Sequence, residues 1–447
     1  MKGNCKNTIH KVNFQVIIWI SVVLATLPSC KSQQCTDGHA QWIDLNEDEN
    51  YTARHECSFV QAGNEFIMFG GRESAKKLDI YNFNENTWRA ARNQAPKEFN
   101  HFQATFYKGF VWVIGAFKTN NFPRELPEDH VWLYHPVTDT WIPGPKIPKN
   151  RRRGGAGLAV YNNKFYLIGG NTIGHDGGYV NWFDEYDPAK NTWKILEDAS
   201  QARDHFSAAI IDNTLYAVAG RHSGGEGGVF APLIKVVDTY NFDTKQWSTL
   251  QHPLPTPRAA PGVAVFQNEL FVMGGEGEAK GPAYNIVEAY NPKTKKWTKK
   301  PAMHYARHGT QAIQSGKGIY IAAGSPNRGG GRQHNMEVYH EDSAEGSPIT
   351  ASHIEAPKSI SIPRNASKTI TIKNTGGNSA SFITSVSITG EHRKHFKLLS
   401  LHDFTLVDAE ASIKIEVANT GHSFGVTSKL KIMYNGISES EIKIVCE

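Results

Sequence analysis

The stretch KFYLIGGNTIGHDGGYVNWFDEYDPAKNTW, residues 164–193, decides the fold of this 447-residue chain. An apolar run ends in Gly169-Gly170, a variable loop follows, and Tyr186 precedes Trp193 by seven positions. The Tyr-to-Trp spacing occurs five times along the chain, and a glycine pair or near-pair begins at positions 70, 115, 169, 219, 274 and 323. Repeats of about 50 residues built from short apolar strands are typical of the blades of a β-propeller.

The repeated glycine mark and the Tyr-to-Trp spacing resemble the kelch family of β-propellers over about residues 41–340. The sixth repeat has Tyr339, but the position where Trp is expected holds Gly346. Trp42 lies 12 residues before Arg54, the same offset as in the third repeat, so we expect an N-terminal strand to complete the last blade. Such closure removes an exposed sheet edge. The alternative is that Trp42 belongs to a frayed lead-in.

Beyond about residue 341 the repeat stops, and segments such as Thr369-Ile370-Thr371-Ile372 alternate polar and apolar residues as half-buried strands do. Lys373–Gly377 resembles bacterial immunoglobulin-like domains. The sequence therefore predicts an all-β chain: a six-bladed kelch β-propeller closed by an N-terminal strand, followed by an immunoglobulin-like β-sandwich. The expected boundaries are a signal peptide at 1–29, a tether at 30–40, the propeller at 41–340, a linker at 341–358 and the sandwich at 359–447.

Three lysines precede an apolar stretch from about Val16 to Leu27, which is the pattern of a secretory signal peptide. The following Leu27-Pro28-Ser29-Cys30 resembles a bacterial lipobox, which implies a lipid anchor on Cys30 and a place in the cell envelope or on the cell surface. Ordinary cleavage and secretion, or a signal anchor, are the alternatives. Removal of residues 1–29 takes three lysines and no acids, so the net charge falls from +5 to +2 and nucleic-acid binding is not expected.

The cysteines of an exported chain are candidates for a disulfide. Cys35 with Cys57 would link the N-terminal lead-in to the first blade, whereas Cys446 has no obvious partner in the sequence. The spacing typical of structural zinc sites is absent, and no tight ligand motif is present. We therefore predict no metal and no other cofactor.

The loops that lead into the innermost strands converge at one mouth of the central channel, which we call the funnel. Polar residues at or beside the same repeat position predict a ring of donors there, which suits an anionic, oxygen-rich ligand. The expected ligand-binding residues are Arg54, His55, His101, Arg153, Arg203, His205, Arg258, Arg307, His308 and Gln311. Any one of the arginines can instead bond carbonyl groups between blades.

The first functional hypothesis is a non-catalytic propeller that binds an acidic carbohydrate, with the C-terminal domain presenting it or docking a protein partner. The second is an epimerase, mutarotase or lyase acting on the same ligands, with Glu56, Asp204, His205 and His308 as candidate acid–base residues. The third is a protein-interaction scaffold that takes an acidic peptide in the funnel. Gly-rich segments at 223–228 and 328–332 are expected to cover the funnel as lids.

Segments 181–187 and 307–313 resemble secreted bacterial kelch proteins of the galactose-oxidase-like type. That resemblance implies copper held by two tyrosines and two histidines, a set that does not map onto this sequence. The six-bladed kelch mutarotases of sialic acid resemble the predicted architecture more closely, but no motif carries their catalytic residues over. The enzyme hypothesis therefore rests on the funnel residues alone.

Overall fold

The structure is a computed structural model that describes residues 40–45, 50–421 and 423–447. The described part is all β apart from three short 3-10 turns, η1 (Lys149–Arg151), η2 (Gly174–Asp176) and η3 (Arg393–His395). Within it, no helix is long and apolar enough to cross a membrane. The predicted signal peptide at 1–29, the lipidation site Cys30 and the tether up to residue 39 lie outside the described residues.

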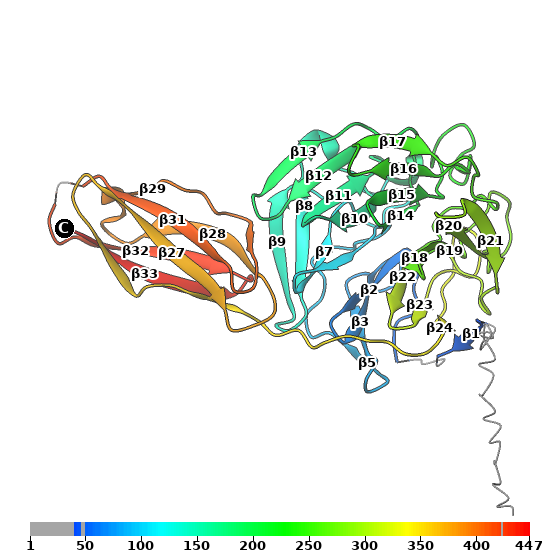
Figure 1. Ribbon diagram of the computed structural model, residues 1–447, viewed down its shortest axis with the longest axis horizontal. Coiled ribbons are helices and arrows are strands. Elements are labelled where there is room, and N and C mark those ends of the chain that lie inside the picture. The colour runs from blue at the N-terminus through cyan, green and yellow to red at the C-terminus, as the bar shows by residue number, and fades with distance from the viewer. Residues whose placement is uncertain (1–39, 46–49, 422) are drawn as a thin grey trace, which may run out of the picture. The chain divides into compact units, whose positions relative to one another are not determined.

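Six four-stranded antiparallel sheets among the described residues form the blades of a propeller and are set around a common centre (Figure 1). The first three blades are β2 (Cys57–Ala62), β3 (Glu65–Gly70), β4 (Leu78–Asn82) and β5 (Thr87–Ala90); β6 (Thr105–Tyr107), β7 (Phe110–Val113), β8 (His130–His135) and β9 (Thr140–Lys146); and β10 (Gly157–Tyr161), β11 (Lys164–Ile168), β12 (Phe183–Asp187) and β13 (Thr192–Ile195). The last three are β14 (Ser207–Ile211), β15 (Thr214–Val218), β16 (Asp238–Asn241) and β17 (Gln246–Thr249); β18 (Gly262–Phe266), β19 (Glu269–Met273), β20 (Val287–Asn291) and β21 (Lys296–Lys300); and β22 (Ala312–Ser315), β23 (Gly318–Ala322), β24 (Met336–His340) and β1 (Trp42–Asp44).

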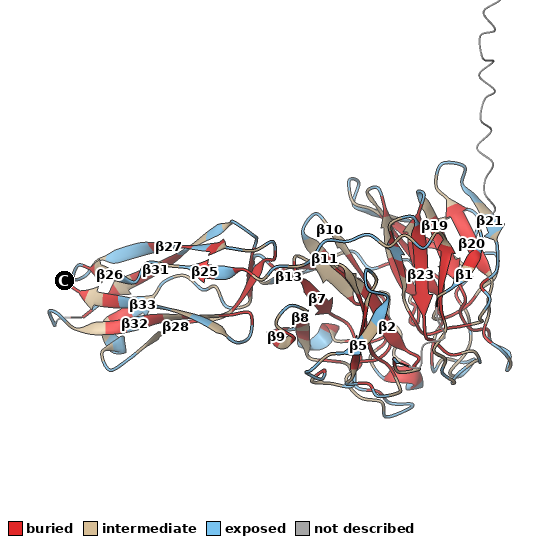
Figure 2. Ribbon diagram, turned by 90° about the horizontal axis from the view of Figure 1, so that it is seen from below, coloured by how far each residue is buried: buried red, intermediate tan, exposed pale blue. Residues whose placement is uncertain are grey.

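The seven-residue Tyr-to-Trp spacing is a hairpin register between the third and fourth strands of a blade. In blade 1, Tyr81 pairs directly with Trp88, and the ring centroids lie 5.1 Å apart. The other four pairs lie in the same register, with centroid separations of 4.8–5.3 Å. Cross-strand aromatic pairs of this kind stabilise a sheet. The second and third strands are buried, whereas outer strands such as β5 and β21 are largely exposed (Figure 2).

The N-terminal strand closes the ring as the sequence predicts. β1 pairs antiparallel with β24, and Trp42 lies opposite Tyr339 with the ring centroids 5.4 Å apart. The Trp42 indole N–H donates to the carbonyl of Pro301 at 2.9 Å, which ties β1 to the fifth blade as well. Trp42, which is 4 % exposed, takes the place in the sixth blade that a Trp holds in the other five.

The C-terminal part is a sandwich of two sheets, with strand orders β25-β27-β31-β29 and β26-β33-β32-β28-β30. Its first strand, β25, lies inside the segment predicted as a linker. The strand is only three residues long and only Ile354 of it is buried, so its sequence signal is weak. Cys446 accepts a hydrogen bond from Asn419 at 2.9 Å. The strands are β25 (His353–Glu355), β26 (Ser359–Ile362), β27 (Ser367–Thr375), β28 (Ser381–Thr389), β29 (Phe396–Leu398), β30 (Thr405–Val407), β31 (Ser412–Asn419), β32 (Thr427–Tyr434) and β33 (Ser438–Cys446).

Candidate functional site

A ring of backbone hydrogen bonds constricts the centre of the propeller. Its members have left-handed φ values between 48° and 69°, one from each blade: Glu56, His101, Gly155, His205, Ala260 and Gly309. Five of them donate their N–H to the carbonyl of the member in the preceding blade, at 2.6–3.2 Å, and the N–H of Cys57 closes the ring on Gly309 at 3.2 Å. For a residue with a Cβ this conformation costs about 1–2 kcal/mol. Such strain is frequently found at functional sites.

The structure brings five of the predicted funnel residues together at this ring. Glu56, His101 and His205 are ring members, and His55 and His308 each lie one residue before a member. All five are between 1 % and 7 % exposed, so they are enclosed groups. Their convergence follows from repeat registration, and their role in binding stays a prediction.

The five predicted arginines do not reach the funnel. Each is enclosed in its own blade at 0–1 % exposure, where its guanidinium donates to strand carbonyls. Each also pairs with a buried carboxylate on the third strand: Arg54 with Asp79, Arg153 with Asp184, Arg203 with Asp238, Arg258 with Glu288 and Arg307 with Glu337. In blade 2 the position equivalent to Arg203 of blade 4 is occupied by the fully buried Phe99. An apolar side chain there indicates that this position serves the packing of the blade.

The side chain of Gln311 forms its hydrogen bonds within the wall of the channel. Its side-chain N–H donates to the carbonyl of Ala104 at 3.2 Å, and its side-chain oxygen accepts from the N–H of Ala104 at 3.0 Å and from the hydroxyl of Ser58. Gln103 spans the opposite wall in the same way, between β10 and β14. These two glutamines hold neighbouring innermost strands together.

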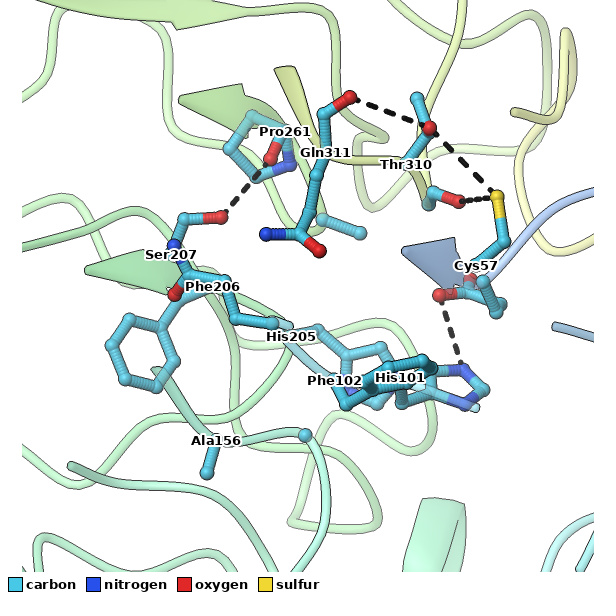
Figure 3. Close-up of a pocket in the computed structure, with 15 residues that line it drawn as sticks. Cys57, His101, Phe102, Ala156, His205, Phe206, Ser207, Pro261, Thr310 and Gln311 are labelled. Atoms are coloured by element: carbon cyan, nitrogen blue, oxygen red, sulfur yellow. Dashed lines mark hydrogen bonds and ion pairs between the residues drawn. The ribbon is translucent and has the colours of Figure 1, made fainter. Parts of the chain in front are cut away.

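Two cavities meet at the ring and share Glu56 and His101. The smaller, of about 40 Å³, is lined by all six ring members together with residues such as Cys57 and Gln311, and Figure 3 shows His101 and His205 lying together in it. The larger cavity, of about 370 Å³, contacts the ring at Glu56 and His101 and is otherwise lined by residues of the surrounding loops. Its lining residues are His55, Glu56, Arg72, His101, Asn120, Phe122, His175, Arg221, Phe230, Glu276, Gly329 and Gly330.

Among the lining residues of the larger cavity are three charged side chains that directly follow a glycine mark, namely Arg72, Arg221 and Glu276. At Gly71, with φ 94°, a Cβ would lie 2.3 Å from the carbonyl oxygen of His55. That close approach lets the N–H of Arg72 donate to the same oxygen at 3.0 Å, which puts its side chain at the mouth. The residue after the glycine mark, charged in three of the six repeats, was therefore a sequence signal for the charged groups of the larger cavity.

Loops between blade strands supply the rest of the larger cavity. Phe122, 61 % exposed, lies with its ring 6.0 Å from the Arg72 guanidinium, and Phe230 lies 5.1 Å from that of Arg221. The predicted lid at 328–332 contributes Gly329, whose N–H donates to Glu276 at 2.7 Å. The variable lengths of these loops hid such residues from repeat registration.

Glu56 joins two imidazoles at the boundary of the cavities. Its carboxylate oxygens lie 3.3 Å from Nε2 of His101 and 3.4 Å from Nε2 of His308. Burial raises the pKa of Glu56, but the two histidines outweigh burial and hold that pKa well below its ordinary value. Burial likewise lowers the pKa of His308, and the carboxylates of Glu276 and Glu56 more than offset this, so its pKa is raised. The pair is therefore a carboxylate beside an imidazolium, which can accept and donate protons.

Asp204 is an orienting group for His205. Its carboxylate accepts a hydrogen bond from Nδ1 of His205, and it also accepts from the N–H and hydroxyl of Ser223, at 3.0 and 2.5 Å. Burial raises the pKa of Asp204, and His205 with its other partners brings it down to about 2. Asp204 is fully buried, does not line the larger cavity, and acts on the site through His205.

Cys57 is a free, buried thiol among the described residues. Its Sγ lies 3.8 Å from both the carbonyl of Gly309 and the hydroxyl of Thr310, and burial raises its pKa to about 12. A thiol in this state is a poor nucleophile. Its predicted partner Cys35 lies outside the described residues.

Comparison with known proteins agrees with the repeat architecture. A family model described as the KLHDC2/KLHL20/DRC7 Kelch-repeats domain matches residues 146–324. The solved structure titled "Structure of YjhT" superposes with a TM-score of 0.56 at 15 % identity, over 66 % of this chain and 96 % of that one. The fold is a kelch β-propeller.

Several curated relatives of this chain are named as Kelch-like proteins. The Kelch-like protein terF of Aspergillus terreus is 27 % identical over 248 residues, which cover 51 % of each chain. Human Kelch-like protein 15 is 27 % identical over 173 residues, covering 38 % of this chain and 25 % of the relative. The chain thus spans about half of the first relative and a quarter of the second.

Proposed function

We propose that the kelch propeller binds a small acidic carbohydrate in its larger cavity. The observation that carries the proposal is a pair of Arg–Phe contacts, Arg72 with Phe122 and Arg221 with Phe230, lining one cavity of about 370 Å³. Guanidinium groups bind carboxylates through charge-assisted hydrogen bonds. Aromatic rings offer apolar faces to the C–H faces of a sugar ring. The volume lies in the range of about 300–1,000 Å³ that is usual for small-molecule sites.

The charges of the cavity favour a ligand with a single carboxylate over a ligand with many negative charges. Arg72 lies 2.5 Å from Glu125, and Arg221 pairs with Glu276, so each cation is already partly balanced. Within the described structure the hydrogen bonds of Arg221 use Nε and Nη1, which leaves Nη2 for a ligand. Glu56 and Glu276 also line the cavity as acceptors for hydroxyl groups. A uronate or sialate matches this mixture better than a heavily sulfated polymer.

The test is titration calorimetry of the full chain with glucuronate and N-acetylneuraminate, with glucose as the neutral probe. Arg72→Gln and the charge-balanced double variant Arg221→Met/Glu276→Gln should each weaken binding of the acidic sugars about 10- to 100-fold, the worth of a charge-assisted hydrogen bond. Arg124→Gln is the matched control, because Arg124 is 76 % exposed and pairs with Asp176 outside the cavity. Equal binding of glucose and glucuronate, or none of either, would contradict the proposal.

The second candidate function is an enzyme acting on the same sugars, and the contact of Glu56 with His101 and His308 favours it. Exchange spectroscopy of sugar anomers with the full chain measures the reaction directly. Acceleration that disappears in both Glu56→Gln and His308→Gln, with sugar affinity kept within about tenfold, supports catalysis by this pair. Acceleration that survives in both variants rules out these residues as the acid and base.

Export and lipid anchoring belong to the same proposal and rest on the sequence of residues 1–30 alone. Expression of the full chain in a bacterial host with a labelled fatty acid should label the wild type and not Cys30→Ser. A protein that is processed at another site and carries no label in either case would favour secretion instead.

A further inference from the structure

Three imidazoles from three blades meet between the two cavities. His101 precedes β6, His205 precedes β14, and His175 lies in η2, in the loop after β11. Their ring centroids are 4.5–4.8 Å apart, and one ligand atom from each lies within 4.8 Å of the others. They are 4–5 % exposed, so their surroundings are protein rather than bulk water.

Each of the three rings has an oxygen acceptor at Nδ1. For His101 the acceptor is the side-chain oxygen of Asn100 at 2.6 Å, for His175 it is the carboxylate of Glu125 at 3.0 Å, and for His205 it is Asp204. A ring that donates from Nδ1 carries its lone pair on Nε2 when neutral. Histidines that ligate metals are oriented in the same manner, through a carboxylate or carbonyl on the other nitrogen.

The Nε2 atoms of His175 and His205 face one another without a matching donor. Nε2 of His175 lies 3.1 Å from Nε2 of His205, and both carry lone pairs in the tautomers just described. Nε2 of His101 is buried with no hydrogen-bond partner among the described residues, at 3.3 Å from the Glu56 carboxylate. A cation at this point satisfies all three nitrogens.

We infer that His101, His175 and His205 bind a divalent first-row transition-metal ion through Nε2. Metal–nitrogen bonds of about 2.0–2.1 Å in a tetrahedral site put the nitrogens about 3.3 Å apart, close to the separation seen between His175 and His205. Three imidazoles favour zinc, copper, nickel or iron over magnesium or calcium, which prefer oxygen ligands. Because His101 and His175 line the larger cavity, a ligand held there can reach the bound ion.

His175 is the ligand that the sequence did not reveal. The other two occupy equivalent positions in blades 2 and 4, each after a polar residue that bonds its Nδ1, in Asn100-His101 and Asp204-His205. His175 reaches the cluster from a variable loop and is held there by Glu125, which belongs to another blade. The sequence therefore led to the expectation of no metal.

The test is metal binding by the full chain in the absence of any sugar. Protein stripped with a chelator should take up one Zn²⁺ per chain, and Co²⁺ should produce the visible absorption of a nitrogen-ligated ion. His175→Ala should weaken Zn²⁺ binding by more than about 100-fold, since loss of even an orienting partner costs about 10- to 100-fold. Glu125→Gln keeps the imidazole and should fall in that 10- to 100-fold range.

Two histidine variants serve as controls. His55→Ala removes an imidazole of the same cavity that contacts Glu73 and stands outside the cluster, so Zn²⁺ affinity should be unchanged. His304→Ala removes the histidine of a second group, made of the exposed Asp44 and His304 with the buried Glu337, which could also hold a cation. Loss of the bound ion in His304→Ala but not in His175→Ala, or no uptake by the wild type, would overturn the inference. Because sugar takes no part, this result stands apart from that of the carbohydrate titration.

Discussion

His308 Nε2 lies 3.4 Å from Glu56 Oε1, and the same nitrogen lies 3.5 Å from Glu276 Oε2. One buried imidazole thus separates two buried carboxylates at the boundary of the two cavities. Its raised pKa means that folding favours its protonated form. The contact is therefore a source of stability that depends on pH.

The stability contributed by His308 should be greatest in mild acid. A histidine with a raised folded pKa contributes fully below its unfolded pKa of about 6.5 and loses that contribution as the pH rises through the folded value. The free energy of unfolding in urea, measured from pH 6 to 9, should therefore decline more steeply for the wild type than for His308→Gln. Burial lowers the pKa values of His101 and His175, but both proteins keep these two histidines. The difference between the two curves therefore reports the contribution of His308. Parallel curves would show that His308 is neutral in the folded chain.

Replacing a buried blade arginine should unfold the blade rather than empty the cavity. Arg307→Met leaves Glu337 buried without its cation, and such a loss costs about 3–5 kcal/mol. The double variant Arg307→Met/Glu337→Gln should recover part of this, because no charge is then left unpaired. Urea denaturation measures both. Sugar affinity that falls with unchanged stability would return Arg307 to the list of ligand residues.

The closing strand should be a major determinant of stability. Trp42→Ala removes a buried ring that packs on Tyr339 and donates to Pro301, and such truncations cost about 3–5 kcal/mol. Leu401→Ala, at a site 83 % exposed, should change stability by no more than about 0.5 kcal/mol. Thermal unfolding of the two variants provides the comparison. Similar melting temperatures for both would mean that the propeller holds without its N-terminal strand.

Relieving the backbone strain of the ring should stabilise the propeller. Ala260 has φ 49°, so Ala260→Gly should raise the free energy of unfolding by about 0.5–1 kcal/mol. The neighbour Ala259 is absent from the positive-φ residues, so Ala259→Gly should lower it by about 0.5–1 kcal/mol. The prediction is confirmed if urea titration gives changes of opposite sign in the free energy of unfolding for these two adjacent positions. A loss in both would indicate that the methyl group of Ala260 matters more than its φ.

The blades and their closure were predictable because the signals are local and repeated. The Tyr-to-Trp spacing encodes a hairpin register, and the Trp missing at position 346 pointed to Trp42. The destination of the arginines was harder to predict. Successive residues of an extended segment point to opposite sides, so Arg54 turns into the blade while its neighbour His55 turns to the cavity.

The candidate site was only half visible in the sequence for a related reason. Repeat position predicted that Glu56, His101 and His205 lie near one another, and all three are members of the ring. Phe122 and His175 lie in loops whose lengths differ between blades, so no register relates them to the ring. Their placement depends on contacts between blades, such as that of Glu125 with His175, which a single sequence does not display.

The hydrogen-bonded ring also bears on the order of molecular events. The smaller cavity at the ring is about 40 Å³, which has room for a few water molecules and not for a sugar. In the proposed binding mode, a sugar that enters past Phe122 therefore has no route onward through the propeller and leaves by the way it came. A second sugar molecule can therefore enter only after the first has left. The residence time of the bound sugar then limits how often the cavity can exchange its ligand.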